Sequence, residues 1–170
     1  MGKYTFVVGW NVEPALEGEA NAVFLRVTET GSGRAVEGLE STVKVAVTYG
    51  GSTKTFEPAL RALRGTPGSY IADIVPTRAG DYIFRFQGKV ETTDLDQRFE
   101  SGPGRFNPIV AQTDLQFPEK VSSPLELSRQ SRAAIDYAET TRTFFIGSLA
   151  LSGMAALLAG TALVQVRRRP

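Results

Sequence analysis

The residues of this chain best suited to bind a cation are carboxylates between positions 91 and 100. Asp94 and Asp96, with Glu91 and Glu100 nearby, offer oxygen ligands of the kind that calcium prefers. Residues two apart on a strand share one face, however, and their spacing does not match an oxygen-rich calcium loop. The pattern therefore favours the solvated edge of a strand over a calcium site.

Two other groups of side chains suggest binding chemistry. Arg61 and Arg64 could hold an anion, but two arginines three apart on a helical turn are more typical of an exposed polar face. Tyr4, Trp10 and Tyr82 could form an aromatic platform for a sugar, but large aromatic side chains more often fill a core. Neither group predicts a site on its own.

Composition removes several classes of function. The chain has neither His nor Cys, so disulfides, thiolate metal sites, cysteine nucleophiles and histidine general bases are excluded. Its net charge is +1, without a long run of one sign, so a nucleic-acid partner is not indicated. We therefore expect a protein that is not an enzyme and that has no cofactor or metal site.

The feature that organises the chain is an apolar stretch near its end. The 23 residues from Thr143 to Gln165 contain no Asp, Glu, Lys, Arg or Pro. A helix of that length measures roughly 34 Å, whereas the hydrocarbon core of a bilayer is about 30 Å thick. We predict a transmembrane helix over residues 143–166, and the alternative interpretation is a buried core helix.

Arginines on both sides of this stretch predict its orientation. Arg142 precedes it, and Arg167, Arg168 and Arg169 follow it in a basic tail over residues 167–170. The positive-inside bias places that tail in the cytoplasm and everything before Arg142 outside. We predict a single-pass protein of the bacterial cytoplasmic (inner) membrane, in contact with lipid, whose main domain is periplasmic. No signal peptide is visible, so we expect a secretion signal upstream of Met1.

One face of the predicted span carries small residues at intervals of four: Ser148, Ser152, Ala156 and Gly160. Such a stripe allows another helix to approach closely, so we predict that it contacts a partner helix. The alternative is that Gly and Ala are simply common in transmembrane helices.

The first hundred residues predict a mainly β domain. Seven short stretches have strand character and are separated by turn signals: 3–10, 21–28, 42–49, 53–56, 68–76, 80–90 and 93–100. Several of them alternate with a period of two, as in Val23, Leu25 and Val27, or in Tyr82, Phe84 and Phe86. We predict an immunoglobulin-like antiparallel β-sandwich over residues 1–100, followed by a linker and one long C-terminal transmembrane α-helix.

Two connecting segments lie between the sandwich and the span. Residues 101–122 are rich in Pro and Gly and predict a linker that runs along the domain, with Phe106, Ile109, Leu115 and Phe117 as apolar anchors. Ser123 to Glu126 has the form of a capping box, which predicts a juxtamembrane helix over residues 123–142. Its apolar face is narrow, so either a protein surface covers it or the helix is a solvated stalk.

Residues 3–107 have a family resemblance. It is carried by three segments in this order: VGWNVEPALEGEANAVFLRVTETGSGRAVEGLE, GSYIADIVPTRAGDYIFRF and FESGPGRF. The chain resembles the bacterial YtkA-like and CopC-like group of exported immunoglobulin-like domains. That resemblance implies a periplasmic sandwich and, in some members, copper held by His and Met. This sequence has no His, and its only methionines are Met1 and Met154, the second within the predicted span.

These features lead to two functional hypotheses. The first is a non-catalytic accessory subunit, whose outer sandwich and membrane helix stabilise or help assemble a larger membrane complex with other integral subunits, respiratory or photosynthetic. The second is a membrane-anchored periplasmic module that binds copper or another small ligand. Metal analysis of the intact mature protein separates the two hypotheses.

Overall fold

The computed structural model describes residues 2–122, 124 and 126–135 of the chain. The chain divides into two compact units, Met1–Val121 and Ser122–Pro170. Most of the regular elements of the first unit are strands, and the described part of the second is helical at residues 124 and 126–135, within the predicted 123–142.

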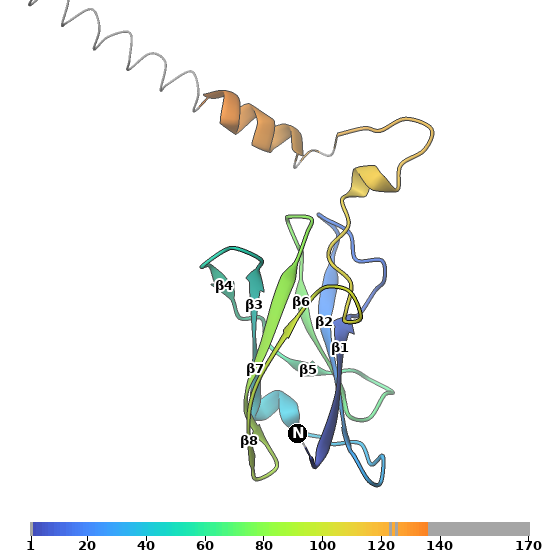
Figure 1. The fold of residues 1–170 in the computed structure, drawn as a ribbon, viewed down its shortest axis with the longest axis vertical. Helices are drawn as coiled ribbons and strands as arrows, with labels where there is room; N and C mark the ends of the chain where they lie inside the picture. Colours follow the sequence, from blue (N-terminus) through green and yellow to red (C-terminus); the bar gives the residue numbers. More distant parts are fainter. Residues whose placement is uncertain (1, 123, 125, 136–170) are drawn as a thin grey trace, which may run out of the picture. The chain divides into compact units, whose positions relative to one another are not determined.

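Eight strands of the first unit form two antiparallel sheets of four strands each (Figure 1). The first sheet has the order β1-β2-β6-β5, with β1 (Tyr4–Trp10), β2 (Asn21–Glu29), β6 (Ser69–Ile74) and β5 (Arg61–Ala62). The second has the order β4-β3-β7-β8, with β4 (Thr55–Phe56), β3 (Val43–Tyr49), β7 (Tyr82–Val90) and β8 (Thr93–Glu100). Two short 3-10 helices, η1 (Leu39–Ser41) and η2 (Gln112–Asp114), lie in the connections. The predicted mainly β sandwich is thereby confirmed.

The core lies between the two sheets, on the faces that the alternating pattern predicts. Val23, Leu25 and Val27 of β2 are fully buried, as are Phe84 and Phe86 of β7. The inward residues of β3 are buried as well: Val43, Val45 and Val47. Tyr4, Trp10 and Tyr82 belong to the same core cluster, so the interpretation of these aromatics as packing residues is confirmed.

One strand was not predicted. β5 contains only Arg61 and Ala62, whose partners in β6 are Ile71 and Tyr70. The helical turn assumed at Arg61 and Arg64 is therefore wrong, whereas both residues are exposed, as predicted. A two-residue strand is too short to display a period of two, and its extended conformation is imposed by pairing with β6 rather than by its own sequence.

The first part of the predicted linker packs into the sandwich. The Phe106 ring stacks on Phe84 at 4.5 Å between centroids, and Trp10 Nε1 donates a hydrogen bond of 3.0 Å to the Asn107 carbonyl. Ile109 is buried and forms a bridge with Gly80. The anchoring roles of Phe106 and Ile109 are confirmed, whereas Leu115 and Phe117 are exposed instead of anchored. Backbone bridges hold this segment to the sandwich only as far as Val110, and Leu115 and Phe117 follow the last of them.

The predicted transmembrane helix and its basic tail lie outside the described residues. Across residues 2–122, 124 and 126–135, no helix combines the length and apolar character that a membrane span requires.

Candidate functional site

The two ends of the sandwich differ in surface chemistry. We call one end the exit end, because the chain continues from it beyond Val121 (upper end in Figure 1). The exit end is formed by residues 11–20, 50–54, 75–81 and 101–121. Six of the large apolar side chains that are exposed in the first unit lie at this end or next to it: Val12, Phe56, Val75, Leu115, Phe117 and Val121.

The opposite end, formed by residues 30–42, 63–68 and 91–92, is the hairpin end. Among its described residues, none is a large exposed apolar side chain. Clustered exposed apolar residues mark interaction sites more often than scattered ones do. The exit end is therefore the part of the sandwich best suited to binding.

A groove of about 1270 Å³ opens near the exit end, beside the short edge strands β4 and β5. Each of these strands has only two residues, so the two sheets leave this side of the sandwich open. Phe56 of β4 and Val75 after β6 are half-exposed and line the groove, and Ile71 lies at its buried wall. The groove is a mostly apolar surface that folding leaves accessible.

The charged side chains that line the groove are mainly cations. Arg61 donates two hydrogen bonds to Asp73, of 2.8 and 2.9 Å, which raises the pKa of Arg61 and lowers that of Asp73. Lys54 and Arg78 also line the groove, and in the described part of the chain neither forms an ion pair. The Arg78 guanidinium lies 5.7 Å from the ring centroid of Tyr49. The groove therefore presents two cations that form no ion pair with a carboxylate of the described residues.

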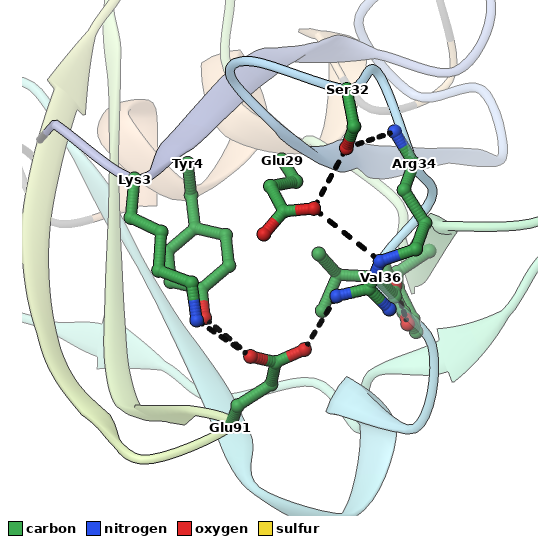
Figure 2. Close-up of polar contacts among 8 residues, drawn as sticks. Lys3, Tyr4, Glu29, Ser32, Arg34, Val36 and Glu91 are labelled. Carbon is green, nitrogen blue, oxygen red and sulfur yellow. Dashed lines mark hydrogen bonds and ion pairs between the residues drawn. The ribbon is translucent and has the colours of Figure 1, made fainter.

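The hairpin end contains a separate polar cluster, in which three side chains converge on Glu91 (Figure 2). Tyr4 Oη donates a hydrogen bond of 2.7 Å to Glu91 Oε2, Lys3 Nζ lies 3.0 Å from the same oxygen, and Arg34 lies 3.0 Å from Oε1. These donors, above all the Tyr4 hydroxyl, hold the pKa of Glu91 at about 2, below its usual 4.5. The cluster joins β1, the loop after β2 and the β7–β8 turn.

The backbone at Glu91 is also unusual. Glu91 has φ of 53°, in the left-handed region that favours glycine, and it is the first residue of the two-residue turn between β7 and β8. Such turns require positive φ to match the twist of their strands. Both carboxylate oxygens already accept charged or hydroxyl donors, so we assign this cluster a structural role in fastening the hairpin end.

The carboxylates first considered for calcium are engaged in ion pairs. Asp96 accepts two hydrogen bonds of 2.7 Å from Arg85 across the β7–β8 pair, and Asp94 lies 3.7 Å from Lys89. Among the described residues, no group of three or more acidic side chains is placed to hold a metal ion. These residues form the charged outer surface of an edge strand, which discourages pairing with another chain.

The residues proposed from sequence for partner contact and topology are not in the described part of the chain: Ser148, Ser152, Ala156, Gly160, Arg142, Arg167, Arg168 and Arg169. Those proposals stay predictions. Sequence reasoning in turn missed the groove, because its lining comes from loops, two-residue strands and the ends of longer strands that are far apart in the chain. The one available signal was Phe56, an apolar residue next to charged Lys54 and Glu57.

Comparison of the chain with protein-family models, with curated proteins and with solved structures finds no match.

Proposed function

We propose that this chain is a non-catalytic, single-pass membrane accessory subunit, whose periplasmic sandwich helps to stabilise or assemble a larger membrane complex. The sequence supports the anchor through residues 143–166 and the orientation through the arginines that flank them. Respiratory and photosynthetic complexes are the assemblies of this kind that we consider first.

We infer that the sandwich is immunoglobulin-like. Its sheet orders, β1-β2-β6-β5 and β4-β3-β7-β8, correspond to immunoglobulin strands A-B-E-D and C-F-G with one strand added beside C. At the start of β7, the F position, Tyr82 Oη donates a hydrogen bond of 3.0 Å to the Arg78 carbonyl, as in the tyrosine corner of such domains. The resemblance to YtkA-like and CopC-like domains stays a prediction, since no comparison identifies a family.

The observation that carries the accessory role is the exposure of Leu115, Phe117 and Val121 at the exit end. Phe117 is 94% exposed, although the same unit buries most of its large aromatic side chains, such as Trp10, Phe84 and Phe86. Exposed aromatic residues in a cluster are typical of the centre of a protein interface. These residues also precede, by about twenty positions, the segment that we assign to the membrane.

This role is tested by purifying the tagged full chain from its native membrane in a mild detergent and identifying co-purifying proteins by mass spectrometry. Phe117→Asp should remove most of the co-purifying complex, because a charge replaces the largest exposed apolar group. Val7→Asp is the matched control, since Val7 is likewise a large exposed apolar residue but lies within β1, outside the segment that carries Leu115, Phe117 and Val121. Equal recovery of a complex with both variants, or no complex with the wild type, contradicts the proposal.

The groove beside β4 and β5 favours a second candidate function, a membrane-anchored module that binds a small ligand. Copper is a poor match, because the chain has no His or Cys, and its two methionines are Met1 and Met154. Metal analysis of the intact mature protein tests copper directly, and stoichiometric copper would favour the module over the accessory subunit.

A further inference from the structure

We propose that the groove beside β4 and β5 binds an anionic amphiphile, a molecule with an apolar chain and one carboxylate or phosphate head group. This inference rests on the second candidate function, that of a ligand-binding module. It adds the chemical class of the ligand and the residues that select it.

The apolar part of the ligand is recognised by the walls of the groove. Val12, Phe56 and Val75 line it and are each about half exposed, so part of their apolar surface remains in contact with water. Covering such surface with a hydrocarbon chain is favourable, because it removes apolar area from water on both partners. The volume of about 1270 Å³ leaves room for a chain rather than for a single ion.

The anionic head is indicated by the charges of the lining. Lys54 and Arg78 lie in the two connections at the exit end, before β4 and after β6. Asp73 is the acidic residue of the lining, and Arg61 already binds both of its oxygens. The lining therefore carries a net charge of +2.

The unit as a whole has the opposite sign. Residues 1–121 contain thirteen Lys and Arg against fifteen Asp and Glu, a net charge of −2. A positive groove on a negative domain is a local property that favours an anionic ligand over neutral or cationic ones. Lys54 provides a flexible point charge, whereas Arg78 provides a planar donor that can bind two oxygens of one carboxylate or phosphate.

The experiment uses the full chain in nanodiscs and four probes with unbranched tails of nearly equal length: octanoate, octyl phosphate, octanol and octyltrimethylammonium. Because the chain has no cysteine, Asn11→Cys in the groove lining carries a single environment-sensitive fluorophore. Thr92→Cys at the hairpin end carries the same fluorophore as a control for probe that enters the bilayer. We expect saturable signals at position 11 alone, with both anions binding at least about tenfold more tightly than the cation.

Charge reversal then tests the head-group site. Lys54→Glu should weaken octanoate binding by about fivefold or more, leave octanol within about twofold and strengthen octyltrimethylammonium. Lys44→Glu is the matched control, because Lys44 is exposed on β3 and does not line the groove. Hexanoate should bind about tenfold more weakly than octanoate, since two methylenes are lost from the apolar contact.

The outcomes distinguish a failure of the anionic selectivity from a failure of the ligand-binding function. Absence of binding by all four probes would contradict the ligand-binding module as well as the amphiphile. If all four probes bind with equal affinity, or if Lys54→Glu does not change the affinity for octanoate, the groove still binds ligands but the proposed selectivity for anions is overturned. Equal responses at positions 11 and 92 would show bilayer partition and also overturn the proposal.

Discussion

Phe84→Ala tests the packing of the sandwich at the centre of its aromatic core. Phe84 is fully buried in β7. Its ring stacks on Phe106 at 4.5 Å and meets the edge of Trp10 at 4.9 Å. Truncation leaves a cavity among three elements and removes two aromatic contacts, so the free energy of unfolding should fall by about 3–5 kcal/mol, in the upper half of that range.

For a unit of this size, one kcal/mol corresponds to roughly 4 °C in melting temperature, so Phe84→Ala should melt at least about 12 °C lower. Trp10 is the only tryptophan of the chain and contacts Phe84, so its fluorescence reports the transition. Phe56→Ala is the matched control, because the Phe56 ring is 54% exposed and its loss should cost less than about 1 kcal/mol. A shift of only a degree or two for Phe84→Ala, or equal shifts for both variants, would refute this description of the core.

Three further predictions concern the hairpin end, the topology and the membrane helix. The Glu91 carboxylate has its pKa lowered to about 2 from 4.5, so its contribution to stability is complete above about pH 4.5 and is lost as the pH falls toward 2. The wild-type melting temperature should therefore fall more than that of Glu91→Gln between about pH 6 and pH 3. If the melting temperatures of the two proteins change in parallel with pH, the Glu91 cluster does not stabilise the fold. An impermeant maleimide should label Ser32→Cys in intact spheroplasts, whereas it should label Pro170→Cys only after lysis. The reverse labelling pattern would show that the topology is opposite to the predicted one. The Gly160→Leu variant should insert into the membrane normally but lose its partner during detergent purification, whereas the Leu157→Ala variant should retain the partner. Equal retention of the partner by both variants would mean that the helix only anchors the chain in the membrane.

Sequence periodicity predicted the long strands well because their pattern is set by burial. Val23, Leu25 and Val27 alternate with residues on the other face, and the two sheets bury one face of each strand. β5 gave no such signal, since two residues contain no period and their conformation depends on pairing with β6. The packing of Phe106 against Phe84 was predictable only as an anchor, because the sequence does not specify which ring it meets.

The candidate sites were less accessible to sequence reasoning. Glu91 was considered together with Asp94 and Asp96 as a neighbour in the chain, but its actual partners are Lys3, Tyr4 and Arg34, between 57 and 88 residues away. Lys54 and Arg78 meet at one groove only because β3 and β6 end, and β4 begins, at the same side of the sandwich. Such juxtapositions follow from topology, which local patterns do not contain.

Native electrophoresis of solubilised membranes shows whether this chain is a subunit of a larger membrane complex. The chain has a mass of 18.4 kDa. We predict that in a mild detergent it migrates with a complex several times that mass, and that Gly160→Leu and Phe117→Asp shift it to the position of the free chain. Migration of the wild-type protein as a free 18.4 kDa chain, unchanged by either substitution, would contradict the account.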